Sequence, residues 1–134
     1  MSRRVRDLMH RNFIQVSPHE RVADVLQLMA LARVRALPVI HGGVWQGLVS
    51  HRDLALAALA GHGVPSGDIA EHVRAIAPVS PDAPLSEAAR RMLGDAAPCL
   101  LAVEGEAGEA RVVGLLTESD LLREAYRTGG GPAA

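Results

Sequence analysis

The chain has 134 residues, enough for one compact unit or for two very small repeats that share a core. Lys and Arg number 14 against 15 Asp and Glu, so the formal net charge of −1 lacks the basic excess of a duplex-DNA binder. Aromatic residues make up 2% of the sequence, too few for the stacking platforms that bind single-stranded nucleic acid. We therefore expect no nucleic-acid partner.

The N-terminus and the apolar runs bear on where the protein resides. The first residues, Met1 to Asp7, are not followed by an apolar signal core. The longest apolar runs fall well short of the roughly 20 residues that a membrane helix needs. The sequence therefore predicts a soluble, cytoplasmic protein with no membrane partner.

An internal repeat organises the sequence. Val16-Ser17-Pro18 returns as Val79-Ser80-Pro81, and Gly47-Leu48 returns as Gly114-Leu115 after an insertion in the second copy. We therefore expect two repeats, residues 1–62 and 63–127. A tail rich in Gly, Pro and Ala, residues 128–134, is expected to be flexible.

Each repeat predicts the same order of elements: strand, helix, strand, strand, helix. A short extended piece ends at Ser-Pro, because proline cannot continue a strand and favours extended backbone before it. Apolar residues at i, i+3, i+4 and i+7 then predict an amphipathic helix. Two short apolar strands joined by a glycine-containing turn follow, and a second helix ends the repeat. The expected ranges are 13–16, 22–29, 36–40, 44–50 and a helix from about 52, then 75–79, 85–92, 99–103, 111–117 and a helix from about 119.

The cysteine, methionine and histidine residues are expected to have structural rather than catalytic roles. Cys99 lies in a leucine-rich strand and is expected to be a buried apolar side chain, and the lone cysteine excludes an intramolecular disulfide. Met9, Met29 and Met92 fit core positions. The six histidines form no metal-binding pattern, and no nucleophile elbow or phosphate-binding loop occurs. We expect no metal site, no catalytic residue and no enzyme activity.

Two four-residue motifs carry the functional hypothesis. Ser50-His51-Arg52-Asp53 and Thr117-Glu118-Ser119-Asp120 stand at matching places, where a strand gives way to a helix. A hydroxyl residue followed three positions later by an acid is typical of a helix capping box. The same corner also suits a nucleotide, because the helix N-terminus attracts phosphate and the carboxylate can accept hydrogen bonds from ribose hydroxyls. Cap and ligand site are compatible, and both interpretations stay open.

With Leu37-Pro38-Val39-Ile40 and the repeated Val-Ser-Pro, these motifs resemble a pair of cystathionine β-synthase (CBS) domains over roughly residues 3–127. The resemblance implies an α+β fold of two β-α-β-β-α repeats packed with pseudo-two-fold symmetry. It also implies a sensory module that binds AMP, ADP, ATP or S-adenosylmethionine in clefts between the repeats and signals to a target protein, which the sequence does not name. This adenine compound would be a regulatory ligand rather than an obligatory cofactor.

The resemblance also implies which residues contact the ligand. Asp53 and Asp120 match the ribose-binding acid of the family, and Ser50 and Thr117 match its hydroxyl. With the residues between hydroxyl and acid included, the expected ligand-binding set is Ser50, His51, Arg52 and Asp53 at the first corner, Thr117, Ser119 and Asp120 at the second, and Ile14, Ala36, Leu37, Pro38, Ala77 and Pro78 as the walls for adenine.

The two corners differ in charge. The first contains His51 and Arg52, and its repeat also has Arg33 and Arg35 just before Leu37, whereas the second contains Glu118. At an effective dielectric of about 20, one unit charge beside a phosphate contributes roughly 3–4 kcal/mol before desolvation. We therefore expect phosphates nearer the first corner, and adenosine, a sulfonium ligand or nothing at the second.

Two further expectations concern partners and alternatives. The stretch 54–60 is apolar all round, which predicts a helix covered on more than one side and hence a homodimer.

The alternative function is a structural or protein-interaction module that no longer binds nucleotide, with both aspartates serving only as helix caps. A hydrolase using His51 and Asp53 is disfavoured, because the pair includes no nucleophile with an oriented base.

Overall fold

The computed structural model describes residues 3–61, 63, 65–106 and 109–128. Its contacts divide the chain into two compact units. The first unit is Ile14–Ile76, and the second combines the chain up to Phe13 with the chain from Ala77 onward. Each unit combines helices with a two-stranded antiparallel sheet, so the predicted α+β class is confirmed. The predicted tail after Thr128 lies outside the described residues.

The first unit places one helix before its β-hairpin and one after it. β1 and β2 pair antiparallel, with Ala36 opposite Ser50 at the open end. The predicted strand at 13–16 is reduced to one parallel bridge, between Val16 and Val39. In chain order the elements are α2 (Val22–Ala32), β1 (Ala36–His41), β2 (Val44–Ser50), α3 (His51–Ala60) and the 3₁₀ helix η1 (Ile69–His72).

The second unit repeats this plan. β3 and β4 pair antiparallel with Cys99 opposite Thr117, and Val79 forms a parallel bridge with Ala102 in place of the predicted strand at 75–79. Its elements are α1 (Val5–Leu8), α4 (Leu85–Asp95), β3 (Cys99–Glu104), β4 (Arg111–Thr117) and α5 (Glu118–Thr128). The helices α1 and η1 were not among the expected elements.

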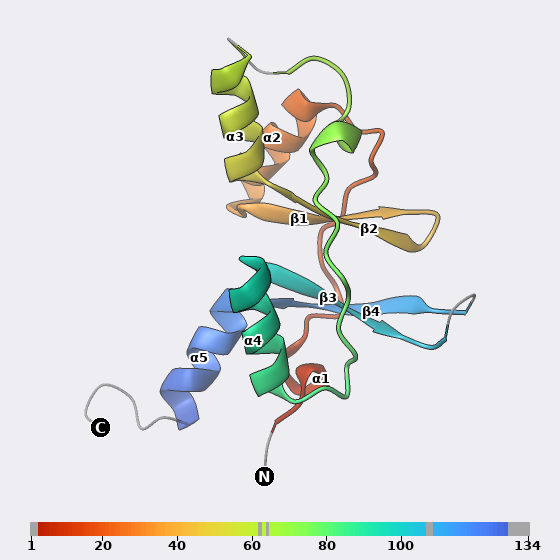
Figure 1. Cartoon of the computed structure of the whole chain (residues 1–134), viewed down its shortest axis with the longest axis vertical. Helices are drawn as coiled ribbons and strands as arrows, with labels where there is room; N and C mark the ends of the chain where they lie inside the picture. Colours follow the sequence, from red (N-terminus) through yellow and green to blue (C-terminus); the bar gives the residue numbers. More distant parts are fainter. Residues whose placement is uncertain (1–2, 62, 64, 107–108, 129–134) are drawn as a thin grey trace. The chain divides into compact units, whose positions relative to one another are not determined.

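Each unit is completed by a segment that the sequence assigns to the other repeat. The backbone of His10 exchanges two hydrogen bonds with Leu115 (2.8 and 2.9 Å), and Arg74 does the same with Leu48 (2.8 and 2.9 Å). Figure 1 shows the red N-terminal segment in the unit of β3 and β4, and the green segment in the unit of β1 and β2. The expected boundary between residues 62 and 63 thus describes the sequence repeat and stays a prediction, whereas the compact units exchange these segments.

The core residues follow the predicted apolar stripes. Val22, Val25 and Met29 of α2 pack against buried residues of β1 and β2, and Ala88 and Met92 are buried on α4. Met9, Met29, Met92 and Cys99 are all buried, as expected. The core cluster of the first unit consists of Val16, Val22, Val25, Met29, Leu37, Val39, Val49, Leu54 and Ile69.

The helix α3 has one buried side and one exposed apolar side. Leu54 of α3 is fully buried, but Leu56 and Leu59 are 52% and 79% exposed, so the unit covers only one side of this helix. The expected homodimer stays a prediction.

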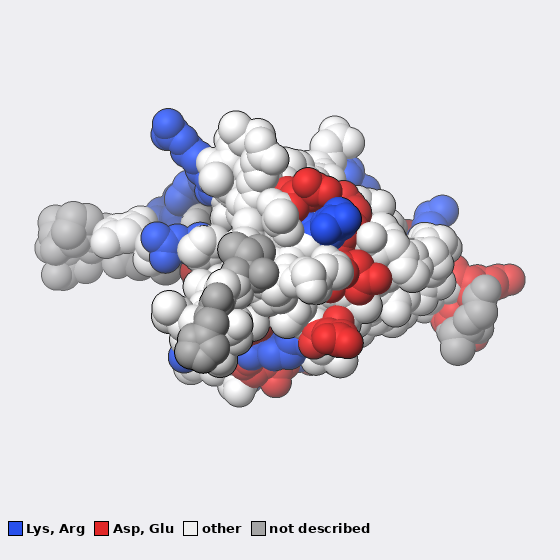
Figure 2. Space-filling view, turned by 90° about the horizontal axis from the view of Figure 1, so that it is seen from above, with Lys and Arg blue, Asp and Glu red and all other residues white. Residues whose placement is uncertain are grey.

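On the face drawn in Figure 2, acidic and basic side chains are scattered among a majority of uncharged residues. Within the described part of the chain, no helix combines the length and apolarity needed to cross a membrane.

Candidate functional site

The first corner is the junction of β2 and α3. Ser50 ends the strand and caps the helix, because its hydroxyl oxygen accepts a hydrogen bond from the backbone N–H of Asp53 (3.0 Å). The carboxylate of Asp53 does not return to the cap. It is half-buried and makes no hydrogen bond or ion pair with any residue that the structure describes. The helix cap therefore uses only half of the motif and leaves the carboxylate available.

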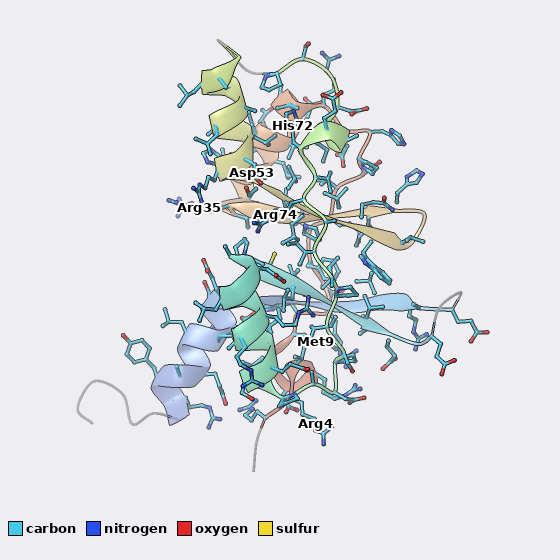
Figure 3. All side chains as sticks on the ribbon, viewed as in Figure 1. Arg4, Met9, Arg35, Asp53, His72 and Arg74 are labelled. Carbon is cyan, nitrogen blue, oxygen red and sulfur yellow. The ribbon has the colours of Figure 1, made fainter. Side chains whose placement is uncertain are left out.

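Basic side chains lie beside this corner. The backbone N–H of His51 donates to the carbonyl of Arg35 (2.7 Å), which fixes the start of α3 beside the residue preceding β1. Figure 3 shows Asp53 at the sheet end of α3, with Arg35 nearby. A hollow of about 470 Å³ opens here, lined by Met29, Ala30, Arg33, Val34, Arg35 and His51. Two guanidinium groups and an imidazole with no carboxylate among the lining residues suit an anion.

The other residues expected at the first site are placed less uniformly. Arg52 is exposed, Ile14 is 43% exposed, and Ala36 is half-buried at the start of β1. Leu37 instead belongs to the hydrophobic core, so its side chain packs inside the unit. Pro38 is buried in the sheet, where its carbonyl accepts from the N–H of Val16 (3.0 Å).

At the second corner, the junction of β4 and α5, the aspartate side chain is buried and bonded to other residues. Asp120 is only 3% exposed, and its Oδ2 accepts hydrogen bonds from the backbone N–H and the hydroxyl of Thr117, both at 2.9 Å. Its Oδ1 contacts Nε2 of His10 at 2.8 Å and accepts from the guanidinium of Arg123. Here the full capping box forms, as the interpretation of the motif as a cap predicts.

The surroundings of Asp120 also set its acidity. Burial alone would raise the pKa of this carboxyl group. The hydrogen bonds from Thr117 and His10 outweigh burial and hold the pKa below its ordinary value. Asp120 is therefore an ionised and fully bonded group of the fold.

The remaining residues expected at the second site are also engaged or turned outward. The carbonyl groups of Ala77 and Pro78 accept hydrogen bonds from the guanidinium of Arg91, at 2.6 Å for Pro78. Ser119 is exposed. The sequence pattern did not indicate that His10 and Arg123 contact Asp120, or that Arg91 donates to the carbonyls of Ala77 and Pro78. Only Arg123 had a local signal, its spacing of three residues from Asp120 on one helix.

Among the described residues, histidine and acidic side chains also lie close together near His19 in the first unit. The rings of His19 and His41 meet edge to face with centroids 5.1 Å apart, and Nδ1 of His19 lies 4.0 Å from Asp68. Over the described residues, no group of three or more His, Cys, Asp or Glu side chains could hold a metal ion.

Known proteins share both the sequence pattern and the fold. A family model of the CBS domain matches residues 5–60 and 67–127. The CBS domain-containing protein YhcV of Bacillus subtilis (strain 168) is 36% identical over 56 residues, which are 42% of this chain and 40% of that protein. The crystal structure of AcuB from Vibrio cholerae matches with a TM-score of 0.82 and 25% identity, covering 97% of this chain and 96% of that one. CBSX2, solved in complex with AMP, matches with a TM-score of 0.76 and 25% identity over 94% of this chain and 98% of its own.

The family match includes both strand-to-helix corners, since each matched range contains one Ser/Thr-x-x-Asp motif. The structural matches extend over nearly the whole length of this chain and of the two crystal structures. The chain belongs to the CBS domain family and contains the domain twice.

Proposed function

We propose that this protein is a regulatory module that binds an adenine nucleotide at the Ser50–Asp53 corner and signals to a partner protein. The observation that carries the proposal is the carboxylate of Asp53, which stands at a strand-to-helix junction and is bonded to no described residue. A carboxylate can accept about four hydrogen bonds, so Asp53 can take both hydroxyls of a ribose. The relative CBSX2 was solved with AMP, which supports an adenine ligand.

The charges beside Asp53 favour a ligand with phosphates. Arg33, Arg35 and His51 line a hollow of about 470 Å³ that can take an anionic group. The N-terminus of α3 adds its partial positive charge on the same side as His51. A sulfonium compound such as S-adenosylmethionine would bring a cation toward these groups. We therefore expect AMP, ADP or ATP to bind better than S-adenosylmethionine.

Signalling requires that the ligand prefer one conformation of the module. A ligand shifts a conformational equilibrium only by the difference between its affinities for the two states. We infer that the regulated target is another protein, which this module contacts in a nucleotide-dependent way. A homodimer formed over the exposed leucines of α3, Leu56 and Leu59, is part of the same proposal. Static light scattering on the full chain tests the dimer.

Isothermal titration calorimetry with AMP, ATP and S-adenosylmethionine tests the proposal on the full chain. Asp53→Asn keeps the shape and removes the charge, and we expect affinity to fall at least tenfold, so far that millimolar AMP gives no saturable heat, because a charge-assisted acceptor is lost. Asp24→Asn is the matched control, since Asp24 is also the third residue of a helix in the same unit and is exposed. Its affinity is expected to equal that of the wild type.

Two results would contradict the proposal. Equal AMP affinity for Asp53→Asn and wild type would place the ligand elsewhere. The absence of saturable heat with all three ligands would support the alternative function, a protein-interaction module. The cap at Asp120 is the observation that favours this alternative, because the aspartate of that Ser/Thr-x-x-Asp motif bonds the residues of its own helix N-terminus.

A further inference from the structure

We propose that the N-terminal segment holds the second corner shut through His10, so that the protein accepts nucleotide at only one of its two corners. The inference rests on the function proposed for Asp53 and adds to it the number of ligands and the residue that sets this number. It is carried by the hydrogen bonds of Asp120 and by the way the segment is fixed to the second unit.

The carboxylate of Asp120 has no capacity left for a ribose. Each carboxylate oxygen can accept about two hydrogen bonds. Oδ2 receives two from Thr117, and Oδ1 faces His10 Nε2 at 2.8 Å and the guanidinium of Arg123. A ribose hydroxyl could donate to Oδ1 only by displacing His10 or Arg123, so it would replace a hydrogen bond that the fold already makes instead of adding one.

His10 is held in place by the segment that carries it. The backbone of His10 pairs with Leu115 on β4, and the preceding residue, Met9, is buried. Further back, the N–H groups of Val5 and Arg6 donate to the carbonyls of Ala83 and Pro81 at 3.0 and 2.8 Å, and Val5 is fully buried. The imidazole is therefore positioned by a packed segment rather than by a loose terminus.

The contact is nevertheless open to displacement. The side chain of His10 is 49% exposed, and a hollow of about 210 Å³ lies beside it. Arg3, Leu8, His10, Asp120, Arg123, Glu124 and Arg127 line this hollow. Of the residues that line the hollow, Arg3 and Arg127 face Glu124, whereas His10 and Arg123 contact Oδ1 of Asp120.

The first unit shows what the corner is like without such a contact. Arg74 occupies the position on β2 that His10 occupies on β4, since it pairs with Leu48 as His10 pairs with Leu115. Asp53 nevertheless accepts no hydrogen bond from any described side chain. The two corners thus share the motif, and in each unit a segment from the other repeat pairs with the strand before the corner. Of these two segments, only the one with His10 brings a donor to the aspartate.

The test removes the carboxylate at the first corner and then asks whether freeing Asp120 lets the second corner bind AMP. Asp53→Asn alone is expected to show no saturable heat with AMP at millimolar concentration. Adding His10→Ala and Arg123→Ala frees Oδ1 of Asp120, and we expect saturable binding of AMP with one equivalent per chain. Adding Asp120→Asn to that triple variant should abolish the binding again. His19→Ala with Arg90→Ala in the Asp53→Asn background changes the same residue types at exposed positions that make no hydrogen bond or ion pair with Asp120, and it should remain without binding.

Thermal unfolding of every variant shows whether it is folded before its titration is interpreted. A folded triple variant that does not bind AMP would overturn the inference. Wild-type protein that binds two equivalents, of which Asp120→Asn removes one, would overturn it as well. Failure of wild type to bind at Asp53 would instead contradict the proposed function, while the triple variant would still report on the second corner.

Discussion

Gly47 lies directly against the carbonyl group of Arg74, so closely that a Cβ atom at Gly47 would overlap the carbonyl oxygen. This contact exists because Arg74 pairs with the neighbouring residue, Leu48, on the edge of β2. Gly47 also has a φ of 142°, a conformation that side chains disfavour. The absence of a side chain at Gly47 therefore permits the segment around Arg74 to pair with β2.

Replacement of Gly47 by alanine should destabilise the protein by roughly 2–4 kcal/mol, because backbone strain and a clash with main-chain atoms act together. Urea denaturation followed by circular dichroism measures the loss. Gly94→Ala is the control, since Gly94 lies within α4 with open space around it. That change should raise the free energy of unfolding by a few tenths to about 1 kcal/mol. Equal stability of Gly47→Ala and wild type would contradict the prediction.

Gly114 is the counterpart of Gly47 in the second unit, but its neighbour is a side chain. A Cβ at Gly114 would lie 2.6 Å from Sδ of Met9. Gly114→Ala should cost roughly 1–3 kcal/mol through overpacking, and Met9→Ala roughly 2–4 kcal/mol through a cavity. The double variant should lose less than the sum by about 1 kcal/mol or more, because each change relieves the other. Gly114→Ala with Met29→Ala, a core methionine of the other unit, should be additive.

The sequence predicted the hairpins and the start of each long helix well, because apolar periodicity and the Ser-Pro and glycine signals mark them locally. It did not show where α2 and α4 end. Both helices are followed by a residue in left-handed conformation, Arg33 (φ 58°) and Ala96 (φ 51°), where a glycine would have been the usual signal. The short helices α1 and η1 were missed because packing against the opposite repeat, rather than local periodicity, stabilises them.

The candidate site was predictable only as far as its motif. The spacing in Ser50–Asp53 and Thr117–Asp120 predicted two caps or two ligand corners, and it could not separate them. The residue that distinguishes the corners, His10, is 110 positions away from Asp120. Contacts over such distances are set by chain topology, which a repeat pattern does not specify.

Cys99 provides a chemical probe of the second unit. Burial, with a contribution from the charge of Glu118, raises the pKa of its thiol to about 12. Compared with the ordinary value of 9.0, the thiolate population at pH 8 falls roughly a thousandfold. A thiol reagent such as dithionitrobenzoate should therefore react with the native chain at least a hundredfold more slowly than with the urea-unfolded chain. The chain contains one cysteine, so the signal has one source. Similar rates in both states would show that the strand is open to solvent.

The two aspartates should differ in how they support the fold. Asp53→Asn should change the free energy of unfolding by less than about 0.5 kcal/mol, since no described group bonds to its carboxylate. Asp120→Asn should cost roughly 1–3 kcal/mol at neutral pH, because it disrupts the capping box and the contacts with His10 and Arg123.

The pH dependence of that cost follows from the acidity of Asp120. Its pKa in the folded protein is lower than its ordinary value of 3.8, so folding favours the ionised form. The stability that this preference adds is complete above the unfolded pKa and is lost as the pH falls through the folded pKa. The difference in stability between wild type and Asp120→Asn should therefore be constant near neutral pH and should shrink below about pH 5. Urea titrations at a series of pH values measure this difference. A difference that grows as the pH falls would mean that the hydrogen bonds of Thr117 and His10 do not outweigh the burial of the charge.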